Sequence, residues 1–261
     1  MPQSGPWDLY DRLIENVPEG SVLEKLTVTR RWALAKIDAP GGAGLAHIAQ
    51  GGRGASLLAA PGTPAREAAG LVKSWDFAAA ATGLAVINAA LNAQRLSMED
   101  AEKPYAGNGF DILRSRASGK KVAVIGHFPR LEAIREAARE MIILERDPQE
   151  GDLPDAAAEF VLPEAELVFM TGSSAVNKTM PRLLELSKGA EIHLVGPSVP
   201  LMTSLLKGPL ASLSGVLITD YPALSTALKL AADGSLEISR APLRRVTYLS
   251  ERLCAQPPAV A

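Results

Sequence analysis

The sequence is poor in the residue types that form disulfides and hold metals. Among its 261 residues there is one cysteine, Cys254, and there are three histidines, His47, His127 and His193. A single cysteine excludes an intramolecular disulfide, and no group of Cys and His has the spacing of a zinc or iron site. We therefore expect no metal site built from protein side chains alone. The sequence does not identify a cofactor.

The chain also lacks an excess of one charge and a long uninterrupted apolar segment. Its 27 Lys and Arg against 29 Asp and Glu give a net charge of -2, so no basic surface for nucleic acid is expected. The longest apolar stretch, residues 77–93, contains Thr82, Asn88 and Asn92, which indicates a buried helix and not a membrane span. With no secretion signal at the start of the sequence, we expect a cytoplasmic protein that contacts no membrane.

The first hundred residues predict a small α+β domain. Thr63 is expected to be an N-cap, with Pro64 at the first position of the helix that follows. Proline, glycine and charged residues between 97 and 119 are typical of a crossing between domains, so we place domains at 1–100 and 101–261. The expected elements are a helix at 6–17, a small antiparallel sheet from 22–37, a flexible Gly-rich connection at 40–54, and helices at 65–73 and 76–94.

After the crossing, short β-branched segments alternate with helical ones. This alternation favours a Rossmann-like domain of parallel strands joined by helical crossovers. The expected strands are 121–125, 141–144, 167–171, 191–195, 216–218 and 246–249, and the expected helices are 130–140, 180–187, 201–206 and 223–231.

Loops that follow these strands carry the candidate site residues, because ligands of open parallel sheets bind outside the carboxyl ends of the strands. Asp220, which follows the strand expected at 216–218, is likewise at the end of a strand. The candidate segments are Gly126, His127 and Phe128; Glu145 with Asp152; Thr171, Gly172 and Ser173, leading to Asn177 and Thr179; and Gly196, Pro197 and Ser198.

His127 and Glu145 are the candidates for proton transfer. His127 either serves as a general acid, base or polar anchor, or is satisfied by loop backbone. Glu145 lies nineteen positions after Gly126, where a nucleotide-binding fold puts its ribose-binding acid; the alternatives are an ion pair with Arg146 or a helix terminus. The turn lacks the G-x-G-x-x-G glycines, so a dinucleotide is weakly supported.

Each remaining candidate also has two interpretations. Asp152 either contacts a ligand or caps a helix starting at Leu153. The polar groups from Thr171 to Ser173 and on to Asn177 and Thr179, with charge added by Lys178, either bind a carboxylate or phosphate or form a helix cap. In the fourth loop, Ser198 is the available hydrogen-bonding side chain. Asn88, four residues before Asn92, bonds neighbouring backbone or faces the cleft between the domains.

Four ordered motifs resemble a known family. GHFP, LERDPQEGDLPD, TGSSAVNKT and GPSVPL resemble the putative heavy-metal chelation proteins, and GLAVINAALNA resembles their N-terminal partner domain. The resemblance implies an α/β protein in which a small α+β enolase N-terminal-like domain precedes a Rossmann-like parallel-sheet domain. It also implies a site between the two domains, with the ligand expectation carried to His127, Glu145, Asp152, Asn177, Thr179, Ser198 and Asn88.

The resemblance implies condensation or hydrolysis on a small polar or heteroaromatic metabolite, in making a pterin-, flavin- or siderophore-like chelator or in heavy-metal handling. In this reading His127 or Glu145 handles protons while Asn177 and Thr179 orient the substrate. Any metal would arrive bound to a small organic ligand, because this chain is a poor chelator by itself.

Two other hypotheses stay open. A non-catalytic carrier or sensor would bind a metal-chelator complex in the same cleft and close its domains around it. An S-adenosylmethionine- or NAD-dependent enzyme gains support from Glu145 and loses it from the missing glycines. A homodimer is expected only from the frequency of dimers among such proteins.

Overall fold

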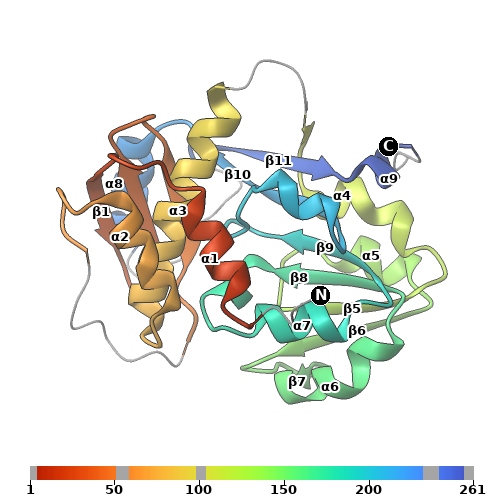
Figure 1. The fold of residues 1–261 in the computed structure, drawn as a ribbon. Coiled ribbons are helices and arrows are strands. Elements are labelled where there is room, and N and C mark those ends of the chain that lie inside the picture. Colours follow the sequence, from red (N-terminus) through yellow and green to blue (C-terminus); the bar gives the residue numbers. More distant parts are fainter. Residues whose placement is uncertain (1–4, 51–58, 98–103, 232–240, 256–261) are drawn as a thin grey trace.

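The computed structural model describes residues 5–50, 59–97, 104–231 and 241–255. Its strands form a three-stranded sheet in the order β1-β2-β3 and an eight-stranded sheet in the order β4-β11-β10-β9-β8-β5-β6-β7. In Figure 1 the smaller sheet lies to the left with α2 and α3, and the larger sheet occupies the right. The predicted mixed α/β fold with a large, mostly parallel sheet is confirmed.

The described residues of the first half form three α-helices and an antiparallel sheet, in agreement with the predicted helix at 6–17 and sheet from 22–37. The predicted N-cap at Thr63 is wrong. Pro64 occupies that position without a side-chain cap, while the Thr63 carbonyl accepts a hydrogen bond from the Leu23 amide at 2.9 Å. The elements are α1 (Asp8–Glu15), β1 (Leu23–Val28), β2 (Trp32–Ile37), β3 (Ala43–His47), α2 (Ala65–Gly70), the 3-10 turn η1 (Leu71–Lys73) and α3 (Phe77–Ser97).

The third strand corrects the prediction of a flexible connection at 40–54, part of which lies outside the described residues. β3 pairs with β2 from Ala43 to His47, although the segment is rich in Gly and Ala. A β-carbon on Gly44 would lie 2.2 Å from the Ala85 carbonyl oxygen of α3. The small residues therefore permit close contact between strand and helix, a tertiary effect that overrides strand propensity.

Helix α3 is the core helix of the first half. Every residue from Ala79 to Ala93 is buried, as predicted for this apolar stretch. Among the described helices it is long and apolar enough to cross a membrane, yet 83% of its most apolar window is buried inside the protein. Its apolar surface is thus covered by β2, β3 and α2.

The larger half alternates strands and helices, as predicted. Several predicted boundaries shift: the helix at 130–140 is shorter, the one at 201–206 is a 3-10 turn, and the strand at 216–218 begins earlier. The elements are β4 (Tyr105–Ala106), α4 (Gly109–Leu113), η2 (Arg114–Ala117), β5 (Lys121–Ile125), α5 (Glu132–Ala137), β6 (Glu140–Glu145), β7 (Leu153–Pro154), η3 (Asp155–Ala157), α6 (Ala158–Val161), η4 (Leu162–Glu164), β8 (Leu167–Thr171), η5 (Gly172–Ala175), α7 (Met180–Leu186), β9 (Glu191–Val195), η6 (Thr203–Lys207), β10 (Leu210–Ile218), α8 (Tyr221–Leu230), β11 (Leu243–Leu249) and α9 (Glu251–Cys254).

Six strands of the large sheet, from β10 to β7, run parallel. β11 was expected in the parallel set, but it pairs antiparallel with β10, and β4 pairs antiparallel with β11. Antiparallel strands at one side of an otherwise parallel sheet are common in α/β proteins, and here β11 and the edge strand β4 lie on that side.

The chain starts the parallel part at β5 and then builds outward in both directions, with β6 and β7 on one side and β8 to β10 on the other. The strand order therefore reverses between β5 and β8. At such a switch point the connections leave in opposite directions and open a crevice at the carboxyl ends of the strands. The register keeps these ends level, since Ile125 pairs with both Leu144 and Met170, and Thr171 pairs with Val195.

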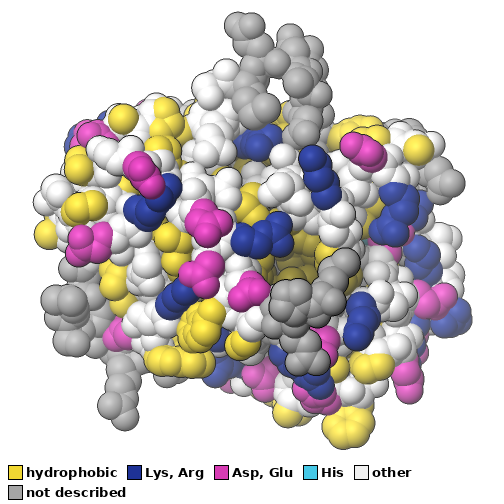
Figure 2. Space-filling view, viewed as in Figure 1, with side chains coloured by type: hydrophobic (Ala, Val, Ile, Leu, Met, Phe, Trp, Pro, Cys, Tyr) yellow, Lys and Arg dark blue, Asp and Glu magenta, His cyan; other side chains and the backbone are white. Residues whose placement is uncertain are grey.

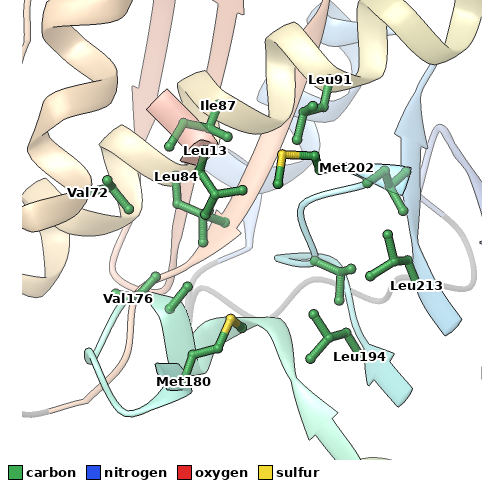
Figure 3. Packing of buried hydrophobic residues seen from close by; sticks show 14 of the residues in the cluster. Leu13, Val72, Leu84, Ile87, Leu91, Val176, Met180, Leu194, Met202 and Leu213 are labelled. Atoms are coloured by element: carbon green, nitrogen blue, oxygen red, sulfur yellow. The ribbon is translucent and has the colours of Figure 1, made fainter. Parts of the chain in front are cut away.

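The two halves share one hydrophobic core. Figure 3 shows Leu84, Ile87 and Leu91 of α3 on the side facing Met180 and Met202 of the larger half, and all five belong to one cluster of buried residues. On the face in Figure 2, basic and acidic side chains are interspersed over both halves, in keeping with the nearly neutral composition.

Candidate functional site

The loops predicted to form the site meet at the switch point. A β-carbon on Gly126, after β5, would lie 3.2 Å from the β-carbon of Thr171, at the end of β8. The Phe128 ring lies next to both Gly126 and Gly196, 3.5 and 3.6 Å from the positions that β-carbons would take there. The structure therefore brings the loops after β5, β8 and β9 into contact.

His127 forms a side-chain pair with Asp152 across this edge. The His127 Nδ1 and Asp152 Oδ2 atoms are 3.1 Å apart. The Asp152 side chain is 3% exposed and the His127 side chain 39%, so the carboxylate is covered while the imidazole reaches solvent. Within the described part of the chain, no hydrogen bond is made by Nε2 of this ring. A carboxylate on one ring nitrogen fixes the tautomer and leaves the other nitrogen to face a ligand.

Asp152 does not cap a helix, which corrects one of the two interpretations of this residue. Leu153 begins the short strand β7 and not a helix. Asp152 Oδ2 instead accepts a hydrogen bond from the Gln149 amide at 3.1 Å, which closes the turn between β6 and β7. The carboxylate is thus held from two sides, by backbone and by imidazole.

Glu145 supports the same loop from the end of β6. Its Oε2 accepts a hydrogen bond from the His127 amide at 2.8 Å, and its Oε1 accepts one from the Arg146 amide at 2.7 Å. The expected alternative of an ion pair with Arg146 is not what forms, because the Arg146 guanidinium pairs with Asp155 at 3.5 Å. Glu145 therefore joins the ends of β5 and β6 and brings a second carboxylate to the histidine loop.

The hydroxyl groups after β8 bond largely to one another. Thr171 Oγ1 and Ser173 Oγ are 2.9 Å apart, and Thr171 Oγ1 also accepts from the Ser173 amide at 3.3 Å, which caps η5. Gly172 permits a close approach, because a β-carbon there would lie 2.5 Å from the Val199 amide nitrogen. The cap interpretation describes these contacts, and the loop after β8 is fixed against the loop after β9.

Asn177 and Thr179 form a turn before α7. Asn177 Oδ1 accepts from the Thr179 amide at 3.1 Å and from the Thr179 hydroxyl at 2.6 Å. The residue between them, Lys178, has φ = 68°, a left-handed conformation that non-glycine residues seldom adopt. These bonds leave the side-chain nitrogen of Asn177 free to donate and the hydroxyl oxygen of Thr179 free to accept further hydrogen bonds.

Ser198 and Asn88 connect the two halves. Ser198 is 2% exposed, and its hydroxyl accepts a hydrogen bond from the His47 amide at 2.8 Å, so it is not the available side chain that the sequence suggested. Asn88 Nδ2 donates to the carbonyls of Leu45, at 2.9 Å, and Ser198, at 3.3 Å. The Asn88 amide nitrogen therefore bonds backbone, while its Oδ1 is buried without a hydrogen-bond partner among the described residues, and Asn92 likewise donates to the Ala43 carbonyl. Pro197 lies half-buried in the same loop.

Sequence reasoning missed His47, which lies at the end of β3 and faces the strand ends of the larger half. Burial lowers the pKa of His47, nearby Arg31 lowers it further, and the Glu145 carboxylate acts in the opposite direction. The Trp32 ring packs edge-on against the imidazole at 5.0 Å. No local pattern marks His47, because its relation to Glu145 arises only when β3 meets the large sheet.

Aromatic and basic side chains gather beside the loop after β6. The Arg146 guanidinium lies 5.6 Å from the centre of the Phe77 ring, and the Lys178 ammonium lies 5.9 Å from the centres of the Phe77 and Trp75 rings. Trp75 is 70% exposed. In contacts of this kind the face of the ring attracts the cation. The start of α3, at Phe77, therefore lies beside the chain segments that follow β6 and β8.

A separate pocket of about 400 Å³ lies between β1 and α8. Three of its hydroxyl groups already pair with one another, since Thr27 Oγ1 lies 2.8 Å from Ser225 Oγ and 3.2 Å from the Tyr221 hydroxyl. The strand-end site is the better candidate, because it joins the switch point, a histidine and two carboxylates.

The residues do not fit a metal held by the protein alone. Over residues 5–50, 59–97, 104–231 and 241–255, no group of three or more His, Cys, Asp and Glu side chains is arranged to hold a metal ion. Cys254 is exposed on the last helix. A pair such as His127 and Asp152 offers too few donors for the usual four-coordinate site.

Comparisons with known sequences find two matching family models with one description. The DUF364 model, described as putative heavy-metal chelation, matches residues 108–241, and the DUF4213 model, with the same description, matches residues 10–91. An uncharacterized protein of Methanocaldococcus jannaschii is 28% identical over 144 residues, which are 53% of this chain and 54% of that protein. The chain therefore spans about half the length of this curated relative.

Two solved structures have the same fold. A DUF364-family protein of unknown function from Desulfitobacterium hafniense is 35% identical, with a TM-score of 0.81 over 95% of this chain and 100% of that one. A DUF364-family protein of unknown function from Pyrococcus horikoshii is 19% identical, with a TM-score of 0.77 over 92% of this chain and 98% of that one. The second likeness bears on the fold alone.

Proposed function

The chain belongs to the DUF364 family of putative heavy-metal chelation proteins, and we propose that it binds a small polar or heteroaromatic metabolite at the carboxyl ends of β5, β6, β8 and β9. It acts on this metabolite by acid–base chemistry of the condensation or hydrolysis type. The metabolite is a metal chelator or a precursor of one, so any metal arrives as cargo bound to that molecule.

The pair of His127 and Asp152 is the observation that carries this proposal. A nearly covered carboxylate holds Nδ1 of a solvent-accessible imidazole at 3.1 Å. This arrangement stabilises an imidazolium that forms during a reaction, so Nε2 can take a proton from a substrate and return it later. A purely structural histidine would not need an exposed ring backed by a covered acid.

Glu145 and His47 extend the site on opposite sides. Glu145 holds the His127 backbone, and its charge reaches His47 of the smaller half. Burial lowers the pKa of His47, so its imidazole is neutral at pH 7 and suited to accept or donate a hydrogen bond to a polar ligand. This supports binding between the two halves.

Ligand retention provides the first test. Native mass spectrometry of freshly purified protein should reveal a co-purified small molecule, with or without a metal ion, that Asp152→Asn and His127→Gln lose. Asp147→Asn is the matched control, because Asp147 is an exposed carboxylate in the same loop and should keep the ligand. Equal retention in the Asp152, His127 and Asp147 variants would contradict the proposed site.

Turnover separates the enzyme from a carrier. The protein is incubated with a small-molecule extract, and consumed masses are followed by liquid chromatography and mass spectrometry. We expect one mass to be consumed by the wild type and to be consumed about 100-fold more slowly by His127→Gln, the usual contribution of a general acid or base. Stoichiometric binding without any consumption would favour a non-catalytic carrier or sensor.

A further inference from the structure

Lys178 is held in an unusual backbone conformation beside the strand-end site. It lies between η5 and α7, on the chain that leaves the carboxyl end of β8, with φ = 68°. The turn formed by Asn177 and Thr179 holds the backbone on both sides. A non-glycine residue persists in this conformation only where its surroundings impose it, and such positions gather at functional sites.

Among the described residues, the Lys178 amine has aromatic neighbours and no counter-ion. Its Nζ lies 5.9 Å from the centres of both the Trp75 and the Phe77 rings. It donates one hydrogen bond, to the Val176 carbonyl at 2.6 Å. No ion pair with a carboxylate is formed by this amine within the described residues, whereas Lys36 and Lys121, for example, each lie within 3 Å of a glutamate.

Partial burial changes the ionisation of this amine. Desolvation lowers the pKa of Lys178 from 10.5 to about 8, because the charged form loses hydration that the aromatic rings replace only in part. A large fraction of the amine is therefore the neutral, nucleophilic form near pH 8, whereas an ordinary lysine is almost entirely protonated there.

The Phe77 ring links Lys178 to the strand-end site. Both the Lys178 ammonium and the Arg146 guanidinium lie near this ring, 5.9 and 5.6 Å from its centre. Arg146 directly follows Glu145, whose carboxylate holds the His127 loop. The amine thus lies along the same edge of the sheet as the acid–base pair.

We propose that Lys178 is a nucleophilic amine that forms an imine with the carbonyl group of a ligand bound at the strand-end site. This deepens the proposed function, on which it rests for the position of the ligand, by naming the substrate class as a small aldehyde or ketone. The uncharged amine attacks the carbonyl carbon to give a carbinolamine. Two protons and the carbonyl oxygen then leave as one water molecule, and a carbon–nitrogen double bond remains, with no oxidant or reductant consumed.

Reductive trapping tests the inference with glyoxylate as the carbonyl compound and sodium cyanoborohydride as the hydride donor. The full-length protein is treated at pH 7, 8 and 9, and the adduct is located by peptide mass mapping. At pH 8 we expect Lys178 to be modified more than about tenfold faster than the exposed Lys188, because far more of its amine is uncharged. Modification of Lys178 at or below the rate of Lys188 would overturn the inference.

Two variants keep the result independent of folding. Lys178→Met should remove the fast adduct, and Lys178→Arg should remove it as well while keeping a positive charge beside Phe77; Lys188→Met should leave the fast adduct intact. Circular dichroism establishes that each variant is folded. A fast adduct that persists in Lys178→Arg would assign the reactivity to another amine and reject the inference.

Failure of this inference is distinguishable from failure of the proposed function. If a co-purified ligand is lost in Asp152→Asn but Lys178 is not preferentially trapped, the acid–base proposal stands and the imine is rejected. If Lys178 is trapped but His127→Gln and Asp152→Asn keep full ligand binding and turnover, the imine stands and the acid–base proposal is rejected.

Discussion

At the scale of single residues, a half-buried carboxylate, Glu191, is held by several partners at the opposite end of the sheet from the candidate site. Glu191, at the start of β9, accepts two hydrogen bonds from Arg116, at 2.9 and 2.5 Å. Glu191 also contacts His193 Nε2 at 3.0 Å and the Lys120 ammonium at 3.8 Å, and His193 Nδ1 lies 2.8 Å from the Ser212 hydroxyl. Because His193 is fully buried, this chain of bonds satisfies polar groups that would otherwise destabilise the core.

Glu191→Gln should destabilise the protein in a pH-dependent way. Burial by itself would raise the pKa of Glu191, but hydrogen bonds from Arg116 and His193 outweigh it and hold the pKa well below the ordinary value of 4.5. The carboxylate therefore stabilises the fold fully above about pH 5, and this contribution is lost as the pH falls through the folded-state pKa. Near pH 7 we expect a loss of about 1–3 kcal/mol in the free energy of unfolding, measured by urea denaturation.

Glu159→Gln is the matched control for that measurement. Glu159 also accepts two hydrogen bonds from one arginine, Arg182, but both side chains are about half exposed. Exposed pairs contribute little because water competes for them, so this variant should unfold close to the wild type. A difference between wild type and Glu191→Gln that stayed constant from pH 7 down to pH 3 would contradict the role of the ionised carboxylate.

The backbone of Lys178 supplies a second prediction at this scale. Replacing a left-handed lysine with glycine removes steric strain, so Lys178→Gly should stabilise the protein by up to about 1 kcal/mol, offset in part by the loss of aromatic contacts. Thermal denaturation measures the change. Arg130, the other described non-glycine residue with φ = 68°, is exposed and provides the comparison through Arg130→Gly.

If Lys178→Gly is more stable than the wild type, the wild-type lysine lowers the stability of the fold. Such a loss of stability is expected at a strained position that is maintained for activity. If Lys178→Gly lowered the melting temperature while Arg130→Gly raised it, the aromatic contacts of Lys178 would be structural. That outcome would assign the strain to packing.

At the scale of elements, the contact between β3 and α3 depends on glycine. A β-carbon on Gly44 would lie 2.2 Å from both the Ala85 oxygen and the Ala89 nitrogen. Gly44→Ala must therefore push the strand away from the helix, at a cost of about 1–3 kcal/mol or more. Gly70→Ala is the matched control, because Gly70 is helical and a β-carbon there meets nothing within 4 Å; it should be neutral or stabilise by about 0.5–1 kcal/mol.

The same contact positions the candidate site. β3 ends at His47, whose amide is held by Ser198, so displacing the strand would move the imidazole relative to Glu145. Chemical denaturation of both glycine variants checks the stability difference. A Gly44→Ala protein as stable as the wild type would show that α3 and β3 can separate without loss, against the close approach in the structure.

At the scale of the whole molecule, the two sheets share a core and are not joined by a thin hinge. α3 packs its buried face against residues from both halves (Figure 3). Domain motion is the default where an interface is small and polar, and a continuous apolar core opposes it. A carrier that closes its domains around a ligand is therefore less well supported than a preformed site.

Unfolding should proceed as one transition. We expect calorimetry to give a single unfolding peak. Leu84→Ala, in α3, and Met180→Ala, in α7, should each shift this same peak to a lower temperature, because each lowers the free energy of unfolding by about 2–5 kcal/mol. Both side chains are at most 1% exposed. The two halves, residues 1–100 and 101–261, should each be less stable when expressed separately than in the intact chain. Two independent transitions in the intact chain would contradict the shared core and indicate two autonomous domains at the predicted boundary.

The sequence by itself determined the types of most elements and the location of the ligand-bearing loops. Apolar periodicity and turn residues act over short distances along the chain, so the strands at 121–125, 167–171 and 191–195 could be predicted closely. Glu145 and His127 were found because a polar residue directly after a buried parallel strand must lie at the carboxyl edge of the sheet.

Only the tertiary structure decided which of these residues meet. β3 forms in a glycine-rich segment because α3 packs against it. Ser198 is buried, and its hydroxyl accepts a hydrogen bond from the His47 amide. Asp152 faces His127 and does not cap a helix. Each of these outcomes depends on contacts between residues far apart in sequence, whose free energy is settled by packing and desolvation and leaves no local pattern. The site is therefore a property of the assembled sheet edge, while its building blocks are properties of the sequence.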